Sequence, residues 1–312
     1  RFCPTLITAS QDALLHGVRT IAAACERFPD VARAVLGIHL EGPCISGLDG
    51  YRGAHPVEHV RDPDWDEFEA LQAASGNRIV LVTLAPERRG AIEFIRRLRA
   101  SGVVVALGHT AADGPTLAAS AGAGATLSTH LGNGIAATLP RHPNPIWHQA
   151  ADDRLAASLI ADDHHLDPAT LRVLARAKGP GRLVLVSDAS PLADAPAGRY
   201  GPWEVLPSGK IVVAGTPYLA GANQGLEVGV SNLILHGGLT LRQALAAATA
   251  QPATLLGLES SRIAAGEAAD FLLGRWSGMG FSGGSGRSFE VRSTFLRGIP
   301  QSESRRIATR PS

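Results

Sequence analysis

The sequence predicts an α/β fold, a (β/α)8 barrel of the TIM type whose first strand is missing. Six short runs of Val, Ile, Leu and Ala each end in a polar or ionisable residue, and helix-like stretches separate them. Near-continuous apolar runs of this kind are typical of parallel strands that are buried on both faces. The 312 residues also accommodate an α/β barrel, which needs roughly 250.

The apolar runs and the N-terminal segment RFCPTLITAS together predict seven strands. They are expected at residues 2–8, 35–41, 79–85, 103–108, 125–130, 155–161 and 183–188. A closed barrel of this type has eight strands. We therefore expect the strand before residue 2 to be absent, with unpaired edges at the first and last of the seven.

Helical segments are predicted between these strands. They are expected at residues 11–27, 64–75, 90–101, 114–123 and 167–178, the last with Pro168 in its first turn. After Asp188 the pattern changes to short alternating segments around the turn signal Pro207-Ser208-Gly209. A last helical pair is expected at 223–236 and 240–256. We predict a barrel domain at 1–260, a remnant of a small β-sandwich domain at 261–300 and a disordered tail at 301–312.

Composition narrows the class of protein. A hydrophobic content of 45% with 18% charged residues describes a globular protein, and a net charge of +1 gives no reason to expect nucleic acid as a partner. No apolar run is long enough to span a membrane. The cysteines Cys3, Cys25 and Cys44 form no CxxC pair, which favours free thiols in a reducing compartment. We therefore expect a cytoplasmic protein.

Four strand-end residues have the chemistry of a metal-dependent hydrolase. Active sites of α/β barrels lie at the C-terminal ends of the strands, where Glu41, His109, His130 and Asp188 would meet. A carboxylate and two imidazoles suit a zinc-like ion, which lowers the pKa of a water molecule and polarises a carbonyl. Asp188 would then accept the proton of that water. Singly, each histidine is more often a hydrogen-bonded core residue, and Asp188 could instead cap a helix.

Several motifs occur together with these residues. They are HLEGP, GAHP, TLAPE, GHTAA, STHLGNG, IADDHH, LVSDA, LAGA and ATAQPATLLGL. In order and spacing, residues 4–273 resemble the N-acetylglucosamine-6-phosphate deacetylases of the amidohydrolase superfamily. The resemblance implies a barrel with a small β domain, one divalent metal ion (Zn or Fe), a homodimer, and hydrolysis of the acetamide of a phosphorylated amino sugar.

The resemblance also implies roles for individual residues. Glu41, His109 and His130 match the metal ligands, and Asp188 matches the catalytic acid/base. Substrate contacts are implied for Ala54, His55, Asn133, Gly134, Arg141, His165, Leu219, Ala220 and Gly221. Among them, Arg141 matches an arginine that binds phosphate and that dimers share. Two positions differ from the family: Gly134 stands where Ala is common, and Asp163 replaces a glycine beside the expected ligand.

Alternative interpretations remain at this point. The chain could deacetylate another N-acyl sugar or an N-acyl amino acid, or it could be a catalytically silent, truncated sugar-phosphate-binding protein. His164 could take the place of His165 if the loop is shifted. Glu87 in TLAPE is expected to make a structural hydrogen bond or to lie at a helix N-terminus. His39 has no partner that the sequence identifies, and His142 and His148 are interpreted as loop residues near the mouth.

Overall fold

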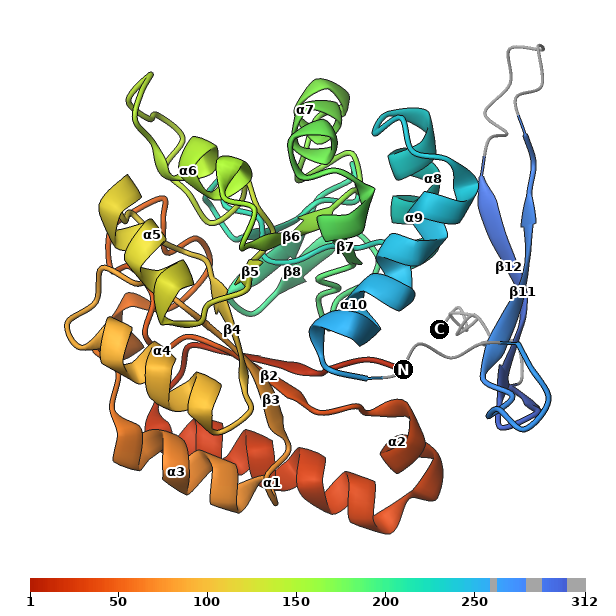
Figure 1. Cartoon of the computed structure of the whole chain (residues 1–312), viewed down its shortest axis with the longest axis horizontal. Helices are drawn as coiled ribbons and strands as arrows, with labels where there is room; N and C mark the ends of the chain where they lie inside the picture. The colour runs from red at the N-terminus through yellow and green to blue at the C-terminus, as the bar shows by residue number, and fades with distance from the viewer. Residues whose placement is uncertain (259–262, 279–287, 302–312) are drawn as a thin grey trace.

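A computed structural model describes residues 1–258, 263–278 and 288–301. All seven predicted strands are present and form one parallel sheet in the sequential order β1 to β7. Their bounds are β1 Thr5–Ile7, β2 Ile38–Glu41, β3 Ile79–Leu84, β4 Val104–Leu107, β5 Leu127–Ser128, β6 Ala156–Ile160 and β7 Leu183–Val186. Among the described residues no further strand joins β1 to β7. The sheet curves as an incomplete barrel inside the helices (Figure 1), which confirms the predicted fold class.

The helices include all the predicted segments and two that were not predicted, α2 and α6. Their bounds are α1 Gln11–Arg27, α2 Pro29–Ala34, α3 Trp65–Ala74, α4 Ala91–Ala100, α5 Gly114–Ala123, α6 Pro145–Ala151, α7 Pro168–Lys178, α8 Leu226–Leu235, α9 Leu241–Ala248 and α10 Ala250–Leu255, with short 3₁₀ turns at Val57–His59 and Pro180–Arg182. Side-chain oxygens of Ser10, Asp64, Asp113 and Asp167 cap α1, α3, α5 and α7 by accepting backbone N–H bonds. These caps explain why the helices begin where they do.

Side chains of β2 show how the core is divided. Ile38 and Leu40 are buried in the same apolar cluster as Leu14 of α1 and Phe68 of α3. Because side chains alternate along a strand, the intervening His39 and Glu41 face the opposite side, the interior of the curved sheet. At β2, the outer face of the sheet therefore packs against the helices through apolar side chains, while the inner face carries polar side chains.

Two small antiparallel sheets follow the barrel strands. The first consists of β8 Gly198–Tyr200, β9 Trp203–Val205 and β10 Ile211–Val213, and its β9–β10 hairpin contains the predicted turn at Pro207 to Gly209. The second consists of β11 Phe271–Trp276, β12 Phe289–Leu296 and β13 Ile299–Gln301. It lies beside α8 (Figure 1), where Phe289 N donates a hydrogen bond to Ser231 Oγ at 2.8 Å.

Two sequence predictions were wrong in detail. The helix expected at 240–256 is divided into α9 and α10 at Thr249, whose φ of −134° and ψ of −77° are not helical. The segment with Trp147 and His148, expected to be a loop, belongs to α6, because Asn144 caps a helix with Pro145 in its first turn. The tail predicted at 301–312 lies outside the described residues except for Gln301, which ends β13. No described helix has the length and apolar character needed to cross a membrane.

Candidate active site

Four of the predicted site residues lie at the C-terminal ends of strands β2, β4, β5 and β7. Glu41 is the last residue of β2, and His109, His130 and Asp188 lie two residues beyond β4, β5 and β7. The latter three have φ values of 49°, 29° and 50°. Such left-handed backbone is uncommon for residues other than glycine and is often found at functional sites. A sharp turn after each strand thus directs these side chains into the mouth of the barrel.

Glu41, His109 and His130 converge on one point. Glu41 Oε1 lies 3.2 Å from His109 Nε2 and 3.0 Å from His130 Nε2, and the two imidazole nitrogens are 3.1 Å apart. All three side chains are buried, with 4–7% of each residue exposed. Three ligand atoms at these separations are as close together as the ligands of one zinc-sized ion, which bind it at about 2.0–2.2 Å.

The hydrogen bonding of His109 indicates that this donor set suits a cation. His109 Nδ1 is 2.9 Å from the carbonyl oxygen of Tyr51, which can only accept, so Nδ1 carries a proton. This bond leaves Nε2 as the nitrogen whose lone pair can face Glu41, as in a metal-binding imidazole. Two acceptors facing each other in a buried site repel unless a cation lies between them. Burial would raise the pKa of Glu41, but the neighbouring His109 and His130 outweigh burial and hold that pKa well below its usual range. The donors therefore fit a divalent metal ion.

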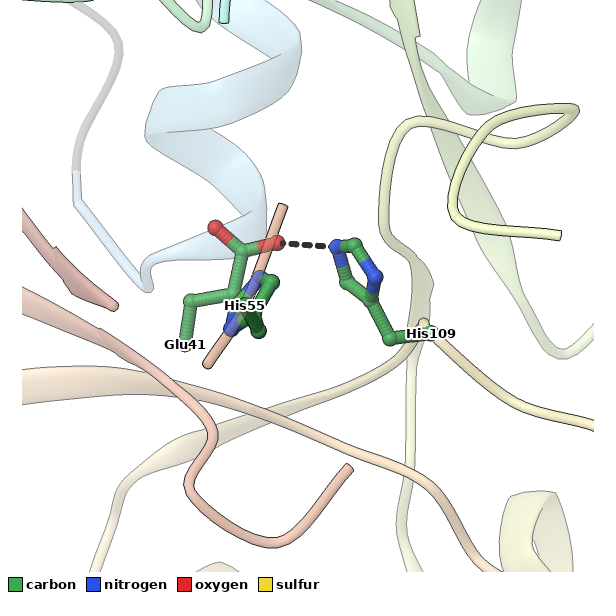
Figure 2. A group of neighbouring side chains, drawn as sticks. All are labelled: Glu41, His55 and His109. Carbon is green, nitrogen blue, oxygen red and sulfur yellow. Dashed lines mark ion pairs between the residues drawn. The ribbon is translucent and has the colours of Figure 1, made fainter. Parts of the chain in front are cut away.

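His55 lies beside this cluster (Figure 2). Its ring centroid is 4.3 Å from that of His109, and ligand atoms of Glu41, His55 and His109 all lie within 4.8 Å of one another. Its Nδ1 is 2.8 Å from Thr8 Oγ1, at the end of β1. Burial, and secondarily the neighbouring His109, lowers the pKa of His55 to about 3. The side chain is therefore neutral near pH 7 and can donate or accept one hydrogen bond at the site.

The depressed pKa of His55 predicts a pH-dependent stability. Below pH 6.5 the unfolded chain binds a proton at this position and the folded chain does not, so stability is complete above that pH and is lost as the pH falls towards 3. Between pH 6.5 and about pH 5, the metal-free wild type should lose about 2 kcal/mol more unfolding free energy than His55→Gln. Urea unfolding at the two pH values measures this difference. His16→Gln, which removes an exposed histidine of α1, should keep the wild-type dependence, and an equal dependence in His55→Gln would contradict the assignment.

Asp188 and His165 are further ionisable residues that line the site. Burial, and then the charge of Glu41, raises the pKa of Asp188, while His130, His165 and His109 oppose the shift. His165 Nδ1 lies 2.8 Å from Asp162 Oδ2, and Asp162 Oδ1 accepts the backbone N–H groups of His164 and His165. Burial would raise the pKa of Asp162, but its bonds to His165 lower it to about 2. The ionised Asp162 therefore fixes the ring of His165.

One cavity of about 370 Å³ contains nearly all the predicted site residues. The metal-ligand candidates and Asp188 line it, together with Ala54, His55, Asn133, Gly134, His165, Leu219, Ala220 and Gly221. Trp203 of β9 and Tyr218, which come after β7 in the chain, also line the cavity, and neither was predicted from the sequence. Arg141 is exposed and does not line the cavity. His164, His142 and His148 do not line it either, so His165 is the histidine of that loop that the structure brings to the site.

The two departures from the family pattern have structural explanations. Gly134 has a φ of 58°, and a Cβ built there would lie 2.7 Å from His109 Nδ1. Glycine therefore lets this loop pack directly on a ligand candidate. Asp163 also has a positive φ, of 62°, which Asp tolerates better than most residues. Its carboxylate does not line the cavity but lies 3.8 Å from His236 Nε2, so the charge expected beside the ligand is directed elsewhere.

Sequence reasoning missed a polar layer beneath the cluster. His39 Nδ1 and Nε2 lie 3.1 Å and 2.7 Å from the hydroxyls of Thr5 and Thr83, and Thr83 Oγ1 lies 2.8 Å from Thr129 Oγ1. The i, i+2 spacing of His39 and Glu41 was a usable signal, because it places both side chains on one face of β2. Glu87 makes the expected structural hydrogen bonds, since its carboxylate accepts from Thr110 Oγ1 at 2.6 Å and Ala111 N at 2.7 Å, directly after His109.

Comparison with known proteins identifies the group to which this site belongs. A scan against known protein families matches residues 2–292 to the amidohydrolase family. The chain belongs to the amidohydrolase family. Human N-acetylglucosamine-6-phosphate deacetylase is 40% identical to this amidohydrolase over 285 residues, which cover 87% of the chain and 68% of the human protein. An N-acetylgalactosamine-6-phosphate deacetylase of Escherichia coli O157:H7 is 35% identical over 258 residues, 82% of the chain and 67% of that protein.

A solved structure has the same arrangement of elements. The crystal structure of N-acetyl-D-glucosamine-6-phosphate deacetylase from Mycobacterium smegmatis is 32% identical to this amidohydrolase, with a TM-score of 0.82 over 95% of this chain and 75% of that one. A mutant of that enzyme, also at a TM-score of 0.82 and 32% identity over 96% of this chain and 75% of that one, was solved in complex with N-acetyl-D-glucosamine-6-phosphate. The family and its fold are thus those that the motifs predicted.

Proposed function

We propose that this amidohydrolase deacetylates N-acetyl-D-glucosamine 6-phosphate to D-glucosamine 6-phosphate and acetate, with one divalent ion, zinc or iron. The observation that carries the proposal is the convergence of Glu41, His109 and His130 within 3.2 Å of one another in the cavity that Asp188 also lines. The similarity to deacetylases of phosphorylated amino sugars supports the substrate class. A silent binding protein would have no need of a buried donor set of this kind.

The protein groups divide the work of amide hydrolysis among them. Glu41, His109 and His130 would hold the ion, which when bound polarises the amide carbonyl and acidifies water. Asp188, whose pKa burial raises, accepts the proton of the attacking water and delivers it to the leaving nitrogen, so that acetate and an amine are released. His165, held by Asp162, and the neutral His55 lie where they can bond the amide or the sugar hydroxyls.

Recognition of the phosphate is proposed to need a second copy of the chain. None of the described residues that line the cavity is Lys or Arg. Arg141 is exposed on the loop before α6, and its guanidinium suits a phosphate dianion. We therefore propose a homodimer in which Arg141 reaches the cavity of the partner. The three cysteines are free thiols, which supports the proposal of a cytoplasmic protein.

Substitution of Arg141 tests the shared site. Arg141→Ala should raise the KM for the phosphorylated sugar about 10- to 100-fold, the range for a lost charge-assisted hydrogen bond, with little change for N-acetylglucosamine. Mixed dimers of Arg141→Ala and Asp188→Asn subunits should recover activity, because one cavity in each then has both groups. A variant with unchanged KM, or mixtures without recovery, would contradict a shared Arg141.

Metal content and acetate release test the function itself. Purified protein is expected to contain about one equivalent of ion and to release acetate from N-acetylglucosamine 6-phosphate faster than from the galactosamine isomer, the unphosphorylated sugar or an N-acetyl amino acid. Faster turnover of one of these other substrates would assign the same chemistry to that substrate. Bound metal without any acetate release would favour the silent binding protein.

A further inference from the structure

Asn133 lines the substrate cavity and also a second, much smaller one. The smaller one, the inner cavity, is also lined by Thr129, Leu131, Ile146 and Gln149, and it shares His109, Gly132, Gly134 and Ile135 with the large cavity. The inner cavity has a volume of about 10 Å³. That is close to the smallest space that accommodates a single water molecule.

Two residues that line the inner cavity each have a buried side-chain atom that is unpaired among the described residues. These atoms are Asn133 Nδ2, a donor, and Gln149 Oε1, an acceptor. Gln149 is 5% exposed, and its Nε2 donates a hydrogen bond to the carbonyl oxygen of Pro145 at 3.3 Å. Because a carbonyl can only accept, this bond fixes which end of the Gln149 amide is oxygen. An unpaired donor or acceptor in the protein interior is unfavourable, because it has lost its hydrogen bonds to water without gaining others.

We propose that Gln149 is a positioning residue for Asn133 and acts through one water molecule bound in the inner cavity. The water donates to Gln149 Oε1 and accepts from Asn133 Nδ2, so one molecule satisfies both atoms. With its nitrogen held in this way, the Asn133 amide presents its oxygen to the substrate cavity, where it accepts a hydrogen bond from an N–H or O–H group of the substrate. The proposal rests on the proposed function, because its kinetic readout is acetate release.

Substitution of Gln149 by Met, alone and together with Asn133→Ala, tests the coupling. Met has a similar length and suits a helix but offers no strong acceptor. Gln149→Met should lower kcat/KM about 3- to 10-fold through a raised KM, the range for one lost hydrogen bond, and should have no further effect in the Asn133→Ala background. An equal effect in both backgrounds, or a lowered melting temperature with unchanged KM, would show that Gln149 is only structural.

Two further measurements keep the proposal testable if Gln149→Met folds poorly. Gln149→Glu retains an acceptor oxygen but loses the donor to Pro145, so its KM should stay closer to that of the wild type than that of Gln149→Met, whatever its stability. A high-resolution crystal structure should contain an ordered water between Gln149 Oε1 and Asn133 Nδ2, and its absence would overturn the proposal. That structure does not depend on activity. A wild type without acetate release would therefore contradict the proposed function alone.

Discussion

Asp188→Asn is expected to lower turnover about 10²- to 10⁴-fold, the range that a positioned general acid/base contributes, without loss of metal. Asn has the shape of Asp but cannot accept the proton of the attacking water. It also tolerates the left-handed backbone at this position, where φ is 50°, so the loop after β7 should keep its conformation. The measurement is kcat for acetate release, together with metal content and far-UV circular dichroism of both proteins.

The alternative role for Asp188 was that of a helix cap. The next regular element after β7 is the strand β8 at Gly198–Tyr200, and Asp188 caps no described helix. If Asp188 were only structural, its substitution would lower the stability of the fold and not the turnover of the folded protein. A folded Asp188→Asn variant with turnover within about threefold of wild type would therefore exclude Asp188 as the base.

The pH profile gives an independent test of Asp188. A base must be ionised to act, and burial raises the pKa of this carboxyl above its ordinary value of 3.8. The rate at limiting substrate should therefore fall as the pH decreases through that raised pKa, at a higher pH than an exposed carboxyl would give. The residual activity of Asp188→Asn should lack this step. A step of the same position in the variant would assign it to another group.

The fold and the convergence of the candidate ligands were predictable because they depend on local sequence patterns. Buried parallel strands give apolar runs whatever their neighbours are, and residues such as Glu41 and His109 follow those runs directly. Helix starts were equally visible, since Asp64, Asp113 and Asp167 are both sequence signals and observed caps. At Thr249 the apolar periodicity continues although the backbone is not helical, so no residue pattern indicated the break between α9 and α10.

Contacts between distant strands were beyond the reach of those patterns. The bonds from His39 to the hydroxyls of Thr5 and Thr83 join three strands, and each threonine alone is an ordinary strand residue. Gln149 could not be identified from the sequence either, because only the packing of α6 against the loop after β5 brings it to the inner cavity with Asn133. Arg141 does not line the cavity of its own chain, and neither the sequence pattern nor a single chain shows what it contacts. A second copy of the chain is proposed to complete that part of the site.

Glu41→Gln is expected to remove bound metal and, with it, nearly all activity. Glu41 is the only anion of the three converging donors, and its Oε1 lies within 3.2 Å of both imidazole nitrogens. An amide offers no net charge, and its NH₂ group would face those nitrogens if it rotated. Since loss of partners that merely orient ligands lowers metal affinity about 10- to 100-fold, loss of this ligand should lower it further. Metal content after dialysis and the dissociation constant for zinc measure the effect.

Glu87→Gln supplies the matched control for that loss. Glu87 also follows an apolar strand, but its carboxylate bonds to Thr110 and Ala111 instead of the converging donors. It should retain metal, whereas loss from both variants would mean that distortion of the loop after β4, not ligand removal, releases the ion. Thermal stability gives a second measurement of metal binding. An ion that binds only the folded state stabilises it by about 2.7 kcal/mol at a free ion concentration of 100 Kd. A chelator should therefore lower the melting temperature of the wild type and of Glu87→Gln, while Glu41→Gln, having no ion to lose, should not respond.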